Sequence, residues 1–344
     1  MHEFWDKQPV PREGVKMGEI ESNKQVSSTP LNLGEGFTWS TCTLEEARTF
    51  LECHYFDEGD TFKFNYTRDI LEWSTEVPGC ENIVIRTNGN IVGYISSVPL
   101  KLKIEDKVVN AVQINFLCVH LQFRSSRFAP LLIGEIKRRA NMRGIWQAIY
   151  TATTKIPTPI TKSEYWHRFL NVKHLVNTDF FKTDRLREKY YEVRGPCKYI
   201  WRKMTTKDIP KVTTILKEYL KDSKLSVVVD SNYVKQWLLP IHTYVNDDSN
   251  DLISFYDVPY DRCDNNGTVK QVYKFYIAGD VYNDAFLIAK NLKYDVFNIL
   301  DVGINTDNLE KLKCMKGTGH VYYYLFNWNL RESINREKID IILP

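Results

Sequence analysis

A short segment in the first half of the chain combines the residue types that bind phosphate groups. The sequence INFLCVHLQFRSSRFAP, residues 114–130, reads as a strand that ends in a basic, serine-containing turn and then opens a helix. Backbone N–H groups at a helix N-terminus attract anions, and Arg124 and Arg127 would add positive charge and hydrogen-bond donors. The pattern predicts a cradle for a pyrophosphate, with an ordinary solvated basic turn as the alternative.

The helix that would present this turn is the clearest element in the sequence. Residues 129–144 begin with Pro130 in the first turn, which suits that position, and end at Gly144, which suits the position after a helix. Between them an apolar stripe recurs at every fourth position, at Leu132, Ile136 and Ala140. This spacing predicts a helix with one face packed against the body of the protein.

Helical and strand-like runs alternate along the rest of the chain, which predicts an α/β fold. The first half has a helix at 44–55 and strands at 82–98, 108–120 and 145–152. The second half has helices at 208–220 and 285–292 and strands at 251–258, 268–277, 294–300 and 321–328. Because the order is similar, we expect two α/β halves that meet near residue 195, preceded by an extended polar arm.

Composition narrows the possible partners. The 344 residues include 46 basic and 43 acidic side chains, so the net charge of +3 gives no long-range field for nucleic acid or an anionic membrane. The seven cysteines form neither a CxxC pair nor a Cys/His cluster at zinc spacing, which indicates reduced thiols in a cytosolic protein. No apolar run approaches the roughly 20 residues that span a bilayer, so we expect a protein without a transmembrane segment.

Several strings, in a fixed order, resemble the N-myristoyltransferase family. The family signature E-I-N-F-L-C-V-H followed by R-S-x-R-x-A-P is matched here, with Gln113 in place of the acidic residue. Arg124 and Ala129 also fit the acyl-CoA cradle of the N-acetyltransferase superfamily, although Arg127 stands where that pattern has glycine. Further matches extend over most of the chain: FWDKQPVP at 4–11, GFTW at 36–39, YTA at 150–152, YWHR at 165–168, ISFY at 253–256, DVFNILD at 295–301 and YYLFNW at 323–328.

The resemblance implies an architecture and an activity. The fold would be α/β, a saddle-shaped mixed sheet of two tandem N-acetyltransferase-like halves. An arm at 1–35 would close over acyl-CoA, residues 36–195 would hold the acyl-CoA, and residues 196–344 would bind the peptide and end in the catalytic carboxylate. The enzyme would transfer myristate from the co-substrate myristoyl-CoA to the N-terminal glycine of proteins and peptides. It would act as a cytoplasmic monomer, without metal, nucleic acid or a permanently bound cofactor.

The same resemblance assigns the chemical steps. Backbone N–H groups of Phe116 and Leu117, on a distorted strand, would form an oxyanion hole, each donor worth roughly 3 kcal/mol; a plain buried strand is the alternative. The C-terminal carboxylate, on Pro344, would be the base, and Thr151 would hold the amine. An amine pKa near 8 and a carboxyl pKa near 3.5 leave a gap of about 6 kcal/mol. Burial in the apolar tail IDIILP would narrow that gap, whereas a frayed tail would not.

Two sets of binding residues follow from the matched positions. The acyl-CoA set comprises Phe4, Trp5, Phe116, Leu117, Cys118, Val119, Arg124, Ser125, Ser126, Arg127, Phe128, Ala129 and Pro130. The peptide set comprises Tyr55, Asp57, Asp60, Phe62, Phe64, Tyr66, Asn115, Tyr165, His167, Ser254, Tyr273 and Leu343. Most of the aromatic residues in the second set could equally be core residues, and the acidic run could be a solvated cluster.

Three departures from the family and two other functions stay open. Thr153 stands where the family commonly has glycine, Thr318 where it often has aspartate, and Pro344 is an unusual last residue. Cys118 is not expected to be a nucleophile, because it lies within a strand and has no neighbouring base. A protein N-terminal acetyltransferase would share the phosphate cradle but not explain the tail. A non-catalytic acyl-CoA or myristoyl-peptide binding protein is the other alternative.

Overall fold

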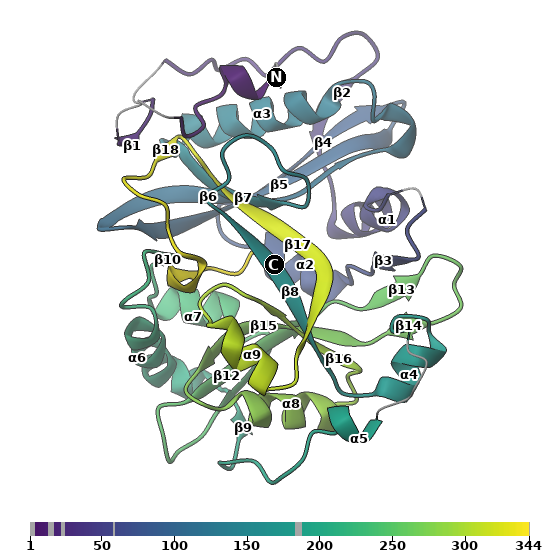
Figure 1. Ribbon diagram of the computed structural model, residues 1–344. Coiled ribbons are helices and arrows are strands. Elements are labelled where there is room, and N and C mark those ends of the chain that lie inside the picture. Colours follow the sequence, from purple (N-terminus) through teal and green to yellow (C-terminus); the bar gives the residue numbers. More distant parts are fainter. Residues whose placement is uncertain (1–3, 13–16, 22–24, 58, 183–187, 344) are drawn as a thin grey trace.

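The computed structural model describes residues 4–12, 17–21, 25–57, 59–182 and 188–343. In these ranges fourteen strands form one large mixed sheet, and the predicted α/β fold is confirmed (Figure 1). The main path of the sheet runs β19 (Ile339–Asp340), β10 (Leu225–Val227), β5 (Asn90–Ile104), β6 (Lys107–Val119), β7 (Gln147–Ala152), β17 (Met315–Phe326), β8 (Thr161–Phe169), β16 (Val296–Leu300), β15 (Gln271–Ala278), β12 (Leu252–Asp257), β11 (His242–Val245) and β9 (Arg202–Lys203).

Smaller groups of strands flank this path. β4 (Glu81–Thr87) pairs with β5, and β2 (Thr38–Thr41) pairs with β4. β1 (Gly18–Glu19) pairs with β18 (Trp328–Asn329), so the start of the chain lies against a segment near its end. A separate sheet joins β14 (Thr268–Val269), β13 (Tyr260–Arg262) and β3 (Phe62–Phe64).

The first half of the chain contributes α1 (Leu44–His54), α2 (Arg68–Thr75), α3 (Phe128–Met142) and α4 (Val172–Asn177), with η1 (Trp5–Lys7) and η2 (Leu121–Phe123). The second half contributes α5 (Glu188–Tyr191), α6 (Ile209–Tyr219), α7 (Ser231–Trp237), α8 (Tyr282–Asn291) and α9 (Thr306–Lys311), with η3 (Thr206–Asp208) and η4 (Arg336–Lys338). In Figure 1, α3 and α1 lie in the upper part of the molecule, α2 lies near its centre, and α4 lies beside α5 in the lower part with α6, α7, α8 and α9.

One strand from the last part of the chain joins the two ends. β17 pairs antiparallel with β7 on one side and with β8 on the other. Tyr323 of β17 is therefore opposite Thr151 of β7 and Thr161 of β8. Because its neighbours come from the first half of the chain, the sheet cannot form fully until the C-terminal part has been placed.

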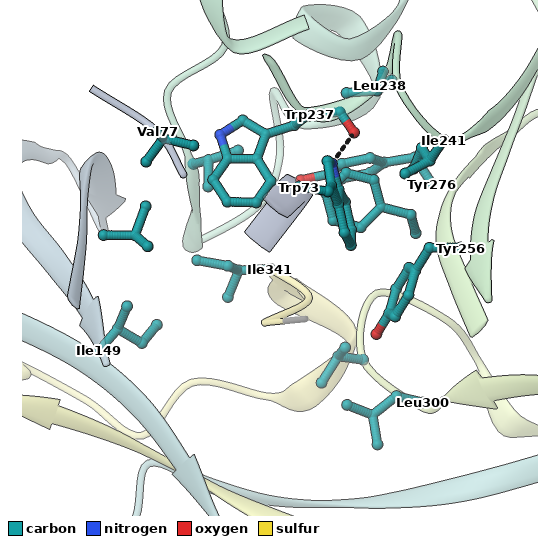
Figure 2. Packing of buried hydrophobic residues seen from close by; sticks show 14 of the residues in the cluster. Trp73, Val77, Ile149, Trp237, Leu238, Ile241, Tyr256, Tyr276, Leu300 and Ile341 are labelled. Carbon is teal, nitrogen blue, oxygen red and sulfur yellow. Dashed lines mark hydrogen bonds between the residues drawn. The ribbon is translucent and has the colours of Figure 1, made fainter. Parts of the chain in front are cut away.

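The largest apolar cluster draws on both ends of the molecule and on the C-terminal segment. Figure 2 shows Ile341, which is 1% exposed, between Val77 and Ile149 on one side and Trp237 on the other. The indole N–H of Trp73 donates to the carbonyl of Trp237 at 3.1 Å, so its polar group is satisfied inside the cluster. Burial of an aliphatic side chain of this size stabilises a fold by about 1.5–3 kcal/mol. The C-terminal segment is thus part of the core.

Some boundaries differ from the sequence-based prediction. The helix at 129–144 is confirmed as α3, and Gly144 after it has φ +74°. The single strand expected at 82–98 is wrong, because Asn88 and Gly89, with φ of 49° and 83°, form a turn between β4 and β5. The strand expected at 268–277 is likewise divided, into β14 and β15, and the one at 321–328 starts earlier, at Met315. Several elements were not predicted from the sequence, among them α2, α7 and β8.

Candidate active site

Strand β6 is distorted at the two residues proposed for the oxyanion hole. Its register against β5 shifts there, so neither Phe116 nor Leu117 has a partner residue in β5 or β7. Phe116 has φ +54°, a left-handed conformation that costs a non-glycine residue about 1–3 kcal/mol. Its buried ring packs against Tyr66 at 5.0 Å and Tyr94 at 6.5 Å between centroids, and these contacts hold the distortion. The bulge frees backbone groups that a regular strand would pair.

The same region is where β6 and β7 separate. Their parallel pairing covers only three residues and ends at Gln113 opposite Ile149. Two residues further on, the buried amide of Asn115 accepts a hydrogen bond from Gln113 at 3.0 Å, while its own Nδ2 has no hydrogen-bond partner in the described part of the chain. Because residues opposite each other in antiparallel strands share a face, Thr151 points to the same side of the sheet as Tyr323. The hydroxyl of Tyr323 donates to the carbonyl of Ile341 at 2.9 Å, so this is the side on which the C-terminal segment lies.

After β6 the chain makes the predicted basic turn. Arg124, Ser125, Ser126 and Arg127 are exposed, and α3 starts at the buried Phe128. Arg127 has φ +58°, which explains why glycine is usual at this position in the acyl-CoA cradle pattern. Among the described residues, the side chain of the N-cap residue Arg127 makes no capping hydrogen bond, so the N–H groups of Phe128 and Ala129 at the start of α3 could bind an anion. The remaining two positions of the turn, Ala129 and Pro130, lie in the first turn of α3 and are partly buried.

The guanidinium of Arg124 is occupied by the acidic loop that follows α1. It lies 2.8 Å from a carboxylate oxygen of Asp57 and donates to the carbonyls of His54 at 3.0 Å and Phe56 at 2.6 Å. The loop also closes on itself, because the N–H of Asp57 donates to the carboxylate of Asp60 at 2.8 Å. The predicted phosphate end and the predicted peptide end are therefore in direct contact through one arginine.

A file of aromatic rings leads away from the bulge. Tyr66 packs on Phe116 and, at 5.8 Å, on Phe64, which in turn lies 6.5 Å from Tyr273. The file continues to Tyr165, 6.0 Å from Tyr273. Further rings pack beside these: Tyr55 lies 5.7 Å from Tyr66, and Tyr256 lies 5.6 Å from Tyr273. Phe62 joins through Tyr260, which lies 4.8 Å from Phe64 and 5.1 Å from Phe62. Residues from both halves of the chain thus form one connected surface of rings.

His167 lies at the far end of this file with a defined tautomer. Its Nδ1 is 2.6 Å from Oδ1 of Asn298, whose Nδ2 donates to Gln271 at 2.8 Å. With the amide of Asn298 oriented in this way, Nδ1 of His167 carries the proton and Nε2 is left as an acceptor. Burial lowers the pKa of His167, so the neutral ring is favoured. A Cβ added at Gly317 would come within 2.2 Å of Nε2, which shows that β17 passes close to this nitrogen.

Comparison with known proteins decides the family. Residues 17–163 match the N-terminal domain, and residues 182–341 the C-terminal domain, described as Myristoyl-CoA:protein N-myristoyltransferase. The chain belongs to the N-myristoyltransferase family. The resemblance read from the motifs is confirmed.

Individual members of the family match over nearly the whole chain. The glycylpeptide N-tetradecanoyltransferase of Drosophila melanogaster is 37% identical, over 99% of this chain and 80% of that protein. Glycylpeptide N-tetradecanoyltransferase 1 of Arabidopsis thaliana is 33% identical, over 99% of this chain and 89% of its own length. The solved N-myristoyltransferase of Saccharomyces cerevisiae with bound myristoyl-CoA superposes with a TM-score of 0.92 at 29% identity, covering 99% of this chain and 94% of that one.

The C-terminal segment of this family member is held in the core up to its last described residue. Ile339 and Ile341 are 0% and 1% exposed, and Leu343 packs partly buried against the main cluster. Pro344, the proposed base, lies outside the described residues. Tyr323, which binds this segment, was not singled out from the sequence, although it begins the string YYLFNW that supports the resemblance.

Two expected site residues lie away from the phosphate turn. Trp5 stacks on Tyr150 with 6.1 Å between centroids, and Phe4 packs on Trp5 at 5.1 Å. Trp5 also packs against the buried cluster that contains Ala140, near the C-terminal end of α3. The basic turn precedes the N-terminal end of α3, at Phe128. Along the helix axis, about 18 Å therefore separate the turn from the position of Ala140, where the arm packs. The arm and the turn would have to contact different parts of one ligand.

Other expected site residues are placed more simply. Ser254 is fully buried, and its hydroxyl lies 2.9 Å from that of Thr243. Burial raises the pKa of Cys118 to about 12, so this thiol stays neutral; Val119 follows it, partly buried. Thr153 lies exposed in a bend just after β7. Its φ is not positive, so the backbone at this position does not require glycine. Thr318 is part of β17 and is exposed.

Two further observations concern the described residues only. They contain no group of three or more His, Cys, Asp or Glu arranged to hold a metal ion. None of their helices is long and apolar enough to cross a membrane.

Proposed function

We propose that this chain transfers a myristoyl group from myristoyl-CoA to the α-amine of an N-terminal glycine. Family membership over nearly the whole chain supports the substrate pair. The observation that carries the chemistry is the left-handed Phe116 in a bulge of β6, directly before the basic turn. Backbone strain of this kind persists only where the surrounding structure enforces it, and it is concentrated at functional sites.

In the proposed reaction the bulge stabilises the developing oxyanion. The amine nitrogen attacks the thioester carbonyl carbon, the carbonyl oxygen gains negative charge, and the N–H groups of Phe116 and Leu117 donate to it. The C–N bond forms in this attack, and the C–S bond breaks as the oxyanion collapses; coenzyme A leaves as a thiolate, which takes up the proton that the acylated nitrogen loses. Substitution of either side chain would leave the two donors in place.

The base in the proposed reaction is the carboxylate of Pro344. It accepts the proton that the ammonium group must lose before attack, and the hydroxyl of Thr151 holds the amine beside it. Support comes from the burial of Ile341 and from its carbonyl bond to Tyr323, which is the cross-strand neighbour of Thr151. A carboxylate in apolar surroundings has a raised pKa and an amine there a lowered one, so both changes favour the transfer.

Arg124 accounts for an order of binding in which acyl-CoA comes first. Its guanidinium is bound to Asp57 and to two carbonyls of the acidic loop. A pyrophosphate at the start of α3 would compete for those donors and would release Asp57 and Asp60 to meet a basic residue of the peptide. The arm residues Phe4 and Trp5 would contact another part of the same coenzyme A.

The peptide would lie along the aromatic file. There Nε2 of His167, as an acceptor, suits the hydroxyl of a substrate serine, and Asn115 would complete the groove. Ser254, which is fully buried against Thr243, would lie beneath the groove. We assign acyl-CoA binding to residues 36–195, and residues 196–344 would complete the peptide groove with Tyr273 and Leu343; we expect a monomer in the cytoplasm.

The test offers myristoyl-CoA and a peptide that begins Gly-x-x-x-Ser, with the same peptide beginning with Ala as the control. Mass spectrometry should detect a tetradecanoyl group on the glycine peptide and none on the control. Transfer of acetyl but not of myristoyl would favour the N-terminal acetyltransferase, and binding without any transfer would favour the non-catalytic binding protein. Equal transfer to both peptides would exclude recognition of glycine.

A further inference from the structure

Behind the last strand lies a group of charged side chains that the proposed reaction does not use. Lys274 of β15 is 3% exposed, and its ammonium donates to the carbonyl of Val302 at 3.2 Å. Burial lowers the pKa of Lys274 to about 8, while the nearby carboxylates of Asp340 and Asp301 act to raise it. A buried lysine needs such partners, because an unpaired ion inside a protein costs several kcal/mol.

Asp301, which follows β16, ties this group to the sheet. It is fully buried, and one of its oxygens accepts from the hydroxyl of Ser163 at 2.6 Å and from the N–H of Glu164 at 2.8 Å. Its other oxygen lies 2.9 Å from the guanidinium of Arg336, in η4, just before the last strand. The sheet thus holds the start of the C-terminal segment through a buried carboxylate.

Asp340 extends the same group into the last strand. Its carboxylate accepts from the hydroxyl of Ser223 at 2.5 Å, and its backbone pairs with Ser226 of β10. Residue 303 must be small here, since a Cβ on Gly303 would come within 1.8 Å of the Asp340 carboxylate. The N–H of Gly303 also donates to the carbonyl of Arg336 at 3.0 Å. Two cations, Lys274 and Arg336, thereby accompany two carboxylates.

The apolar residues of the segment do not fix its register. The sequence IDIIL at 339–343 has four apolar residues out of five, so a shift by two positions would still place an isoleucine at the site of Ile339. That shift would move Ile342 to the site of Asp340 and would displace the chain end by about 6.6 Å. Among the side chains of residues 339–343, Asp340 is the one that distinguishes the two registers, and a buried polar group is best known for that role.

We propose that Lys274, Asp301, Arg336 and Asp340 form a charge latch that fixes the register of residues 339–343 and so positions the terminal carboxylate. The inference rests on the proposed function, in which that carboxylate is the base. The four side chains are positioning residues, because none of them needs to touch a substrate.

The test compares Asp340→Asn, Lys274→Met and the double variant in the full-length chain. Each single variant should lose 10- to 100-fold in kcat, because a misplacement of about 1 Å can cost 100-fold. KM for myristoyl-CoA should stay within twofold. The double variant removes one cation and one carboxylate from the same group and leaves its net charge unchanged, so its thermal midpoint should return towards that of the unaltered chain while kcat stays low, because the register signal is still missing.

Lys224→Ala is the matched control, since the exposed side chain of Lys224 pairs with the exposed Glu332, at 4.0 Å, beside the same segment. It should leave kcat and the thermal midpoint unchanged. If kcat recovered together with stability in the double variant, the latch would have a structural role only. If kcat were unchanged in the single variants, the proposal of a charge latch would be overturned. Removal of residues 343–344 separates the two proposals. Full turnover after this truncation would refute the terminal carboxylate as the base. Loss of turnover after the truncation, together with unchanged kcat in the latch variants, would refute the latch alone.

Discussion

The two ends of the candidate site are built in opposite ways. The open end, residues 121–130 with the acidic loop at 57–60, has exposed charges, and its ion pair joins Arg124 and Asp57 side chains that are 41% and 85% exposed. The closed end, residues 336–343, carries Ile339 and Ile341 in the core, pairs Arg336 with the fully buried Asp301, and binds the carboxylate of Asp340 to the hydroxyl of Ser223. A charged group that must exchange its protein partner for a ligand needs to be exposed, as at the open end. A base that must stay in one place needs to be held by the core, as at the closed end.

The strongest test of this contrast removes the closed end. Deletion of residues 343–344 should lower kcat by about 100- to 10,000-fold, because a positioned general base typically contributes that much. Affinity for myristoyl-CoA should change less than twofold, since the open end stays intact. Steady-state rates and direct titration of myristoyl-CoA measure the two quantities. A parallel fall in affinity would show that the two ends are not independent.

The next test compares the stability that each end contributes. Ile341→Ala should lower the free energy of unfolding by about 2–5 kcal/mol, because it leaves a cavity in the main cluster. Leu121→Ala, at an exposed leucine of the open end, should change it by less than about 0.5 kcal/mol. Urea denaturation followed by tryptophan fluorescence measures both. Similar losses at the two positions would contradict the contrast.

Sequence reasoning described the open end better than the closed end. The turn at 124–127 and the helix after it follow from local signals, namely the arginines, Pro130 and Gly144. Nothing local predicts φ +54° at Phe116, because the rings of Tyr66 and Tyr94, distant in sequence, enforce it. The place of β17 between β7 and β8 is likewise a long-range property, whereas the turn at Asn88 and Gly89 carried a signal that should have divided the expected strand.

The contact between myristoyl-CoA and the open end can be tested with two substitutions that should change the affinity for myristoyl-CoA in opposite directions. Arg124→Gln should weaken myristoyl-CoA binding by about tenfold, since a charged hydrogen bond is worth about 1.5–3 kcal/mol. Asp57→Asn removes the competitor for the same guanidinium and should tighten binding by up to about fivefold, as expected for an exposed pair worth at most about 1 kcal/mol. Titrations at two salt concentrations should show a smaller salt dependence for Arg124→Gln. Weaker binding by Asp57→Asn would refute the exchange.

The smallest expected effect concerns pH at the open end. The rings of His54 and His120 lie 3.9 Å apart between centroids, and Nδ1 of His54 is buried without a hydrogen-bond partner among the described residues. Burial, followed by the charges of His120 and Arg124, lowers the pKa of His54 to about 4, below the value near 6.5 of the unfolded chain.

The folded state therefore binds fewer protons than the unfolded state between these two values. Its stability is complete above pH 6.5 and falls as the pH drops towards 4, by about 1 kcal/mol once the partial exposure of the ring is allowed for. His54→Asn should flatten this part of the pH profile of the thermal midpoint. The same substitution should leave kcat at pH 7.5 unchanged, because the closed end is not involved. An acid-induced loss of stability that is identical in the two proteins would place the sensitive group elsewhere.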